Sequence, residues 1–341
     1  MKGAIDRSIP RQLLILLIVL GAALPMGDRP AGRAAMQTML NQPPAQLEPS
    51  DPCELAAFLD QFFAEQMAVH HVPGAVFVLV QDGAVRFAKG YGYADRERHV
   101  PADPATSRFR VASVSKLFPI IGVLQLAEQG RIDLDADVNT YLSDLHITNP
   151  FAEPLRVRHL GSLITYGGYG VALAGHLIEQ VSGLRFEQYI DQRIFQPLGM
   201  SHSSFVQDLP PDLTKDVAVV YTYDESRSYA PAPLIYNNTA PTGGLSTTAM
   251  DMARVLMALL NGGRAAEGQI LSERMAQAML DQQFTPHSGL PGLNYGFMEE
   301  VANGQRALIR DGSGMACVRR FICCRSSAWV TSMPRTARAT R

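Results

Sequence analysis

The stretch Ser113-Val114-Ser115-Lys116, at the start of a long apolar run, constrains this chain more than any other feature. The run ends at Gly130, a residue type that often ends a helix, so a helix is predicted to begin near Ser113. Residues three apart share a helix face, so the Lys116 amine can reach the Ser113 hydroxyl. A desolvated lysine there can lose its proton near neutral pH and activate the serine. The alternative is a helix-capping serine beside a solvated lysine.

Long stretches around this motif resemble the serine β-lactamase-like hydrolases, which include class C β-lactamases, penicillin-binding D-Ala-D-Ala peptidases and related esterases. The stretches are FRVASVSKLFPIIGVLQLAEQGRIDLDADVNTYL, LRVRHL, GYGVALAGHLIEQVSGLRFEQYIDQRIFQPLGM and TGGLSTTAMDMARVLMALLNGG. The resemblance implies an α+β fold of two lobes. An antiparallel sheet flanked by helices (about 51–108 and 240–316) would adjoin a mostly helical lobe (about 117–235), with the nucleophile helix at their boundary.

The same resemblance implies an acyl-enzyme mechanism without cofactor or metal. Ser113 would attack the carbonyl of an ester, a β-lactam or a D-Ala-type peptide, and Lys116 would move the proton. Tyr166 stands where the family carries Y-x-N, so its phenol would relay a proton to the leaving group. Gly168 stands in place of the asparagine of that motif. Without the resemblance, Tyr166 would be interpreted as a buried structural tyrosine.

Arg310-Asp311-Gly312-Ser313 stands where the family carries K-T-G or H-x-G on a sheet edge. Gly312 would let substrate lie close to the backbone, and the N–H of Ser313 would hold an oxyanion together with that of Ser113. Arg310 keeps a positive charge that could bind a substrate carboxylate, but it cannot act as a base. The alternative for Arg310 is an ordinary strand arginine.

Two features of the chain depart from the family. The sequence passes from RVRHLGSL almost directly to ITYGGYG, which predicts a missing segment, a short natural loop being the alternative. Residues 317–341 hold six arginines, three cysteines and the only tryptophan, without an acidic residue. They lack the period of a strand or helix, so a disordered tail is expected, with an uncovered sheet and weak stability. A basic arm for nucleic acid or anionic lipid is the alternative for this tail.

The N-terminus has the pattern of a bacterial secretory signal. Three basic residues precede an apolar run from Leu13 to Ala23. We therefore predict a signal over residues 1–35 and export to the periplasm or the medium. An uncleaved anchor is the alternative, but a membrane span needs about 20 apolar residues. Residues 36–50 are interpreted as a linker, and residues 51–316 as the hydrolase domain.

The composition is that of an ordinary globular protein, 47% hydrophobic with a net charge of −2. This balance gives no reason to expect a nucleic-acid partner, and no stretch beyond the N-terminal signal predicts contact with a membrane. The expected partner is a small molecule or a peptidoglycan-type peptide. Because the second and third motifs are degenerate, a catalytically impaired or inert binding protein on the same fold is the alternative function.

The segment before the nucleophile motif predicts a helix and a hairpin. Apolar residues recur at helical spacing between Asp51 and His70. Two strands, Gly74–Val80 and Val85–Tyr91, flank Asp82-Gly83, a dipeptide typical of a two-residue hairpin turn. The four cysteines match no metal-site spacing, and no essential disulfide is expected.

Overall fold

A computed structural model describes most of the chain. The described residues are 13–16, 52–160, 168–208, 214–223, 228–233, 236, 238–265, 268–287, 290–302, 305–314 and 317–324. Within these ranges, no helix is long and apolar enough to cross a membrane.

The predicted hairpin is confirmed as strands β2 (Gly74–Gln81) and β3 (Ala84–Asp95), which pair antiparallel. Asp82 and Gly83 both have positive φ, as the mirror-image hairpin turns require. Every residue of β2 from Gly74 to Val80 is buried, so both faces of this strand are covered.

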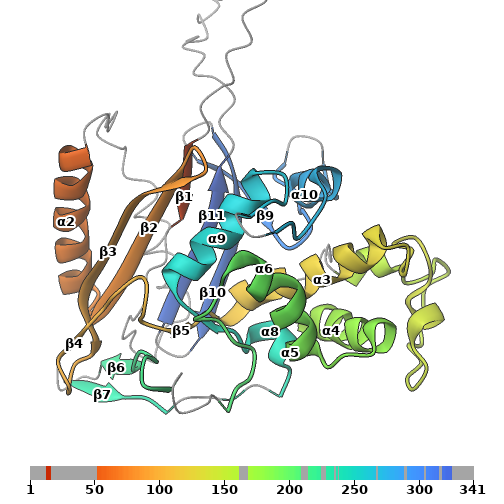
Figure 1. The fold of residues 1–341 in the computed structure, drawn as a ribbon, viewed down its shortest axis with the longest axis horizontal. Coiled ribbons are helices and arrows are strands. Elements are labelled where there is room, and N and C mark those ends of the chain that lie inside the picture. The colour runs from red at the N-terminus through yellow and green to blue at the C-terminus, as the bar shows by residue number, and fades with distance from the viewer. Residues whose placement is uncertain are drawn as a thin grey trace, which may run out of the picture.

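Side chains alternate between the two faces of β2, and each face packs into a different hydrophobic cluster. Ala75, Phe77 and Leu79 pack with Leu59 and Phe63 of helix α2 (Pro52–Val69). The alternate residues Val76, Val78 and Val80 face the main core of the protein. Helix α9 (Ala249–Leu260) contacts β2 and contributes to that main core. Figure 1 accordingly shows α2 on the outer side of the hairpin and α9 on the inner side.

Strand β1 (Leu13–Leu16) comes from the apolar run that predicts a secretory signal. It pairs antiparallel with Val78–Gln81 of β2, and the short strand β4 (Val100–Pro101) pairs with β3. Figure 1 shows β1 between β2 and strand β11, which it contacts. Export of the protein stays a prediction, because this placement does not test it.

A second antiparallel sheet has the order β11-β10-β9. Its strands are β9 (Met298–Ala302), β10 (Gln305–Gly314) and β11 (Cys317–Cys324). The expectation of an irregular tail from residue 317 is therefore wrong for its first eight residues, which pair along β10 from Gly314 to Ala307. Phe321 and Cys323 alternate on the buried face, and Phe321 stacks on Phe297. Residues 325–341 lie outside the described part.

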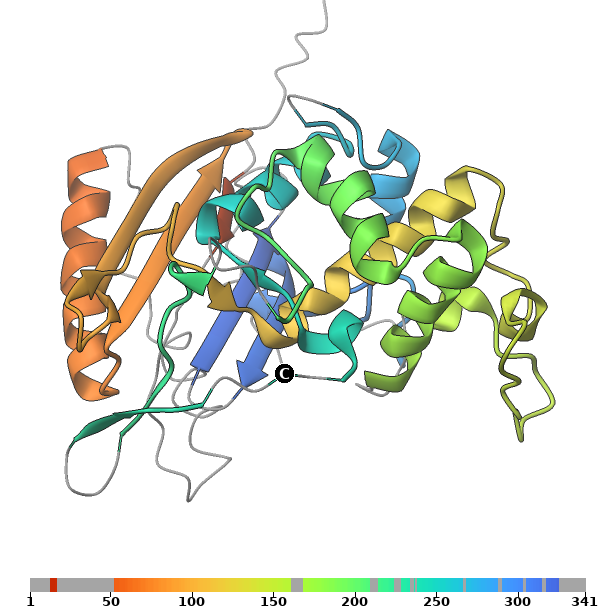
Figure 2. The ribbon, with the colours of Figure 1, turned by 60° about the horizontal axis from the view of Figure 1, so that its bottom comes forward.

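Helices and short turns make up the other lobe of the molecule, as the resemblance implied (Figure 2). They are α3 (Leu117–Glu128), α4 (Gly168–Ser182), α5 (Phe186–Ile190), α6 (Gln196–Leu198) and the 3₁₀ turns η2 (Val138–Tyr141) and η3 (Val157–Leu160). Between α5 and α6, the segment η4 (Asp191–Phe195) is a π-helix.

Further short elements complete the described fold. Strand β5 (Phe109–Arg110) pairs with β8 (Ser246–Thr247), and β6 (Tyr221–Tyr223) pairs with β7 (Tyr229–Pro231). The short helix α8 (Ala240–Gly243) precedes β8, and α10 (Glu273–Leu280) precedes β9. The fold is α+β, as predicted, and the pair β5–β8 brings the nucleophile motif beside the glycine-rich turn Thr242–Ser246.

Candidate active site

The candidate nucleophile lies in a tight turn between β5 and α3. Ala112–Lys116 forms the 3₁₀ helix η1, which continues directly into α3. The Val111 N–H donates to the Leu245 carbonyl at 3.0 Å, which ties the start of the turn to the glycine-rich segment. Ala112 has a φ of 46°, a left-handed conformation that strains a residue with a Cβ. The predicted helix start is therefore a strained 3₁₀ turn, and the hydrogen bond to Leu245 holds it in place.

Lys116 Nζ lies 2.6 Å from Ser113 Oγ and donates a second hydrogen bond to the Thr242 carbonyl at 3.0 Å. Lys116 is buried, with 6% of its surface exposed, while Ser113 is half-buried. Burial, and to a lesser degree the neighbouring charge of Arg310, lower the pKa of Lys116 from 10.5 to about 8. About a tenth of the lysines with this pKa are neutral at pH 7, and a neutral amine can accept the serine proton.

Ser115, the other serine of the motif, has a structural role. Its side chain is fully buried, and its Oγ accepts a hydrogen bond from the Leu245 N–H at 3.1 Å. The two serines therefore differ in environment, because only Ser113 contacts the lysine amine within the motif.

Strand β10 brings the third predicted motif against the nucleophile turn. A Cβ added to Gly312 would lie 2.3 Å from the Val111 carbonyl oxygen and 3.3 Å from the Ser113 nitrogen. Only glycine fits such an approach without displacing the backbone. Arg310 is buried two residues earlier on the same strand. Ser313 pairs with Val318 of β11, and its assignment as an oxyanion donor stays a prediction.

The second predicted motif is described only in part. Tyr166 lies outside the described residues, so its role as a proton relay stays a prediction. Gly168 opens α4, and a Cβ placed on it would lie 3.7 Å from Thr242 Cγ2. Gly168 therefore sits close to the residue whose carbonyl holds Lys116.

Thr242 is the site residue that sequence reasoning missed. The contact of this residue with Lys116 is made by its backbone carbonyl. Every residue type carries such a carbonyl, so no signal in the sequence could have singled out Thr242.

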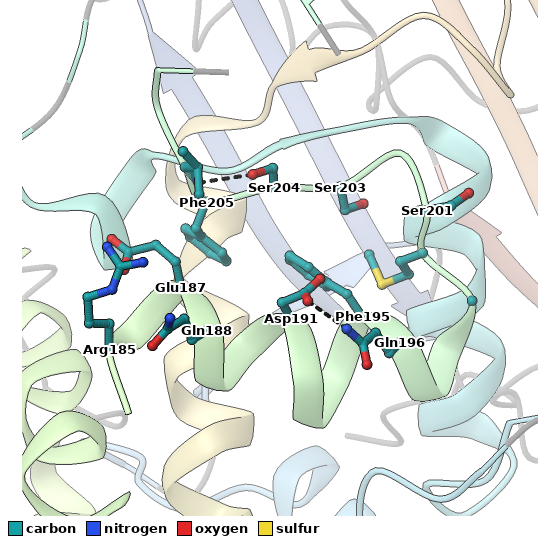
Figure 3. Close-up of a pocket in the computed structure, with 13 residues that line it drawn as sticks. Arg185, Glu187, Gln188, Asp191, Phe195, Gln196, Ser201, Ser203, Ser204 and Phe205 are labelled. Atoms are coloured by element: carbon teal, nitrogen blue, oxygen red, sulfur yellow. Dashed lines mark hydrogen bonds between the residues drawn. The ribbon is translucent and has the colours of Figure 1, made fainter. Parts of the chain in front are cut away.

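A cavity of about 570 Å³ lies away from this cluster (Figure 3). It is lined by residues of α5, η4 and α6 and by the segment 199–206, and includes none of the residues that surround Ser113. Its wall nevertheless adjoins the site, since Ser204 pairs with Ser246 of β8. Ser203 in the same wall donates to buried Asp251 at 2.8 Å, which fixes this segment against α9.

Comparison with known proteins decides the family. The β-lactamase family model matches residues 59–163 and 161–323, which together are most of the chain. The chain belongs to the β-lactamase family. The two matched stretches meet at residues 161–163, next to the place where the sequence predicts a missing segment. The match also runs to residue 323, which agrees with the observed strand β11 and not with a departure from the family that begins at residue 317.

Two relatives are similar in sequence. Protein flp of Staphylococcus aureus strain N315 is 24% identical over 244 residues, covering 60% of this chain and 48% of flp. The putative penicillin-binding protein PbpX of Bacillus subtilis is 26% identical over 257 residues, covering 67% of this chain and 62% of PbpX. The chain thus spans about half of the length of the staphylococcal relative.

Solved structures show the same fold. The octameric penicillin-binding protein homologue of Pyrococcus abyssi superposes with a TM-score of 0.68 at 25% identity, covering 80% of this chain and 74% of that one. A β-lactamase/D-alanine carboxypeptidase of Pseudomonas syringae gives 0.66 at 15% identity, covering 80% and 94%. At that lower identity the likeness concerns the fold.

Proposed function

We propose that this protein is a serine hydrolase that forms an acyl-enzyme on Ser113. The observation that carries the proposal is the 2.6 Å contact between Lys116 Nζ and Ser113 Oγ, with a lysine whose pKa is lowered to about 8. The neutral amine takes the hydroxyl proton as Oγ bonds to the substrate carbonyl carbon. The carbonyl oxygen becomes an oxyanion beside the Ser113 N–H and β10. Collapse of this intermediate expels the leaving group, which receives a proton, and water then releases the acyl group.

The substrate is an ester, a β-lactam or a D-Ala-type peptide. Arg310 supports a substrate with a carboxylate near the scissile carbonyl, because it places a buried positive charge close enough to Lys116 to lower its pKa. The names of PbpX and of the Pseudomonas syringae protein point to peptide and lactam carbonyls for those proteins. Tyr166 is proposed to relay the proton to the leaving group.

Export is proposed from the N-terminal pattern of basic residues before Leu13–Ala23. Strand β1 gives this proposal a distinct test, because cleavage near residue 35 would remove the strand that pairs with β2. Expression of the full gene in a bacterial host, followed by fractionation and N-terminal sequencing, measures both events. A mature protein outside the cytoplasm supports export, whereas an uncleaved chain confined to the cytoplasm contradicts it.

One observation favours the alternative of an inert binding protein. Gly168 offers no side-chain amide beside the lysine, whose second hydrogen bond goes to the Thr242 carbonyl instead. A carbonyl can only accept, so it fixes the protonated amine more strongly than the neutral one. That preference opposes the deprotonation that catalysis needs.

The experiment is a comparison of turnover by three forms of the protein. An activated ester, a chromogenic cephalosporin and a D-Ala-D-Ala peptide are offered to the wild type, to Ser113→Ala and to Ser115→Ala as the matched control. Hydrolysis of at least one substrate by the wild type and Ser115→Ala, but not by Ser113→Ala, is the expected result. Hydrolysis that persists in Ser113→Ala, or no turnover by a folded wild type, rejects the proposal.

A further inference from the structure

An exposed aromatic side chain is stacked on a charge that is anchored to the active-site turn. The ring centroid of Tyr236 lies 5.4 Å from the guanidinium carbon of Arg110. The exposed fraction of Tyr236 is 55%. One side of the ring faces Arg110, and much of the remaining ring surface is open to solvent.

Arg110 is held firmly in place by contacts with two segments. Its Nη1 donates to Gln207 Oε1 at 3.2 Å and to the Gly244 carbonyl at 3.4 Å, while its Nη2 donates to the Gln207 carbonyl at 3.2 Å. Its backbone is part of β5, which pairs with Ser246 of β8. A guanidinium fixed in this way gives the tyrosine ring a rigid support.

Arg110 is anchored to the same part of the chain as the Ser113–Lys116 pair. Arg110 precedes Ser113 by three residues, and Gly244 follows Thr242, the partner of Lys116, by two. The guanidinium that supports Tyr236 and the Ser113–Lys116 pair are thus anchored to the same two short segments of chain. A substrate group that extends from the scissile carbonyl past Arg110 would meet the open side of the Tyr236 ring.

We propose that Tyr236, supported by Arg110, is a specificity-determining residue that binds an aromatic group on the acyl side of the substrate. The proposal rests on the proposed acyl-enzyme function of Ser113. A cation behind the ring draws electron density toward itself, which makes the outer side a better partner for an electron-rich aromatic ring. Offset stacking of two rings changes binding by roughly 3- to 10-fold beyond the burial of area. An alkyl group of similar size gains binding free energy from the burial of area but none from stacking.

The first test measures selectivity with thioesters of N-acetylcysteamine, whose leaving thiol is not aromatic. The ratio of kcat/KM for the phenylacetyl thioester to that for the hexanoyl thioester is compared among variants. Tyr236→Ala is expected to lower this ratio roughly 3- to 10-fold, mainly through a higher KM for the phenylacetyl substrate. Tyr236→Phe is expected to preserve the ratio because it keeps the ring. Phe151→Ala, which removes a 77% exposed aromatic side chain from the helical lobe, is the matched control.

The second test does not need turnover. Binding of phenylacetate and of hexanoate to Ser113→Ala, and to the double variant with Tyr236→Ala, is measured by NMR titration. Preferential binding of phenylacetate that is lost in the double variant supports the inference even if the wild type hydrolyses nothing, in which case only the proposed function fails. An unchanged preference in both tests overturns the inference. So does a change of equal size in Phe151→Ala.

Discussion

Replacement of Lys116 by methionine measures how strongly the fold disfavours the charged lysine. The pKa of Lys116 falls from 10.5 to about 8, chiefly because the amine is buried. At about 1.4 kcal/mol per pKa unit, this shift means that the protonated lysine reduces stability by about 3 kcal/mol. Methionine has a similar length without the charge, so Lys116→Met lacks this penalty. The variant does lose the hydrogen bond to the Thr242 carbonyl, which offsets part of the gain.

The dependence on pH separates the charge from the lost hydrogen bond. Between pH 8 and pH 10.5 the unfolded lysine keeps its proton while the folded one has released it, so raising the pH in this window favours the folded state. The penalty is fully present below pH 8 and disappears above pH 10.5. Between pH 7 and pH 10, the free energy of unfolding of the wild type should therefore increase by about 2.5 kcal/mol relative to that of Lys116→Met.

Urea denaturation of both proteins at pH 6, 7, 8, 9 and 10 provides the assay. Groups other than Lys116 titrate in both proteins, so their contributions cancel in the difference between the two free energies of unfolding. A difference that is flat from pH 6 to 7 and then rises in favour of the wild type is the expected result. A difference that stays constant up to pH 10 would refute the lowered pKa, and with it the lysine as a base near neutral pH.

Three further substitutions test the construction of the site. Gly312→Ala places a Cβ 2.3 Å from the Val111 carbonyl oxygen, so we expect a loss of about 1–3 kcal/mol of stability and an activity loss on the order of 100-fold, measured by denaturation and by turnover. Ala112→Gly relieves the left-handed strain at φ 46° and should raise the free energy of unfolding by about 0.5–1 kcal/mol; a lower value would contradict the strain. Ser115→Ala leaves the buried Leu245 N–H without its acceptor and should lower stability by about 1–3 kcal/mol, so an unchanged melting curve would contradict the structural role.

Short-range sequence patterns predicted the parts of the structure that depend on neighbouring residues. Asp82-Gly83 fixes its hairpin because only a few residue types adopt the two positive φ values of that turn. Ser113 and Lys116 meet because an offset of three residues brings side chains together on one helical face. Both results are local, so they hold without knowledge of the rest of the fold.

Features that depend on distant contacts were not predictable in the same way. The arginines of β11 obscure the alternation of Phe321 and Cys323, and the strand is fixed by its pairing with β10. The pairing of β1 with β2 could not be foreseen, because a short apolar run is equally consistent with a signal segment. The contact between Lys116 and the Thr242 carbonyl joins residues that are far apart in sequence and leaves no pattern in residue type.

The most direct test of the account is to locate the acyl group on the protein. Wild type, Ser113→Ala and Ser115→Ala are incubated with a fluorescent penicillin and with an activated ester, quenched in acid, and analysed by intact mass and peptide mapping. We expect one acyl group per chain, attached to Ser113 in the wild type and in Ser115→Ala, with labelling that increases from pH 6 to pH 8 as Lys116 loses its proton. An adduct on Ser115, or one that forms equally well in Ser113→Ala, would contradict it.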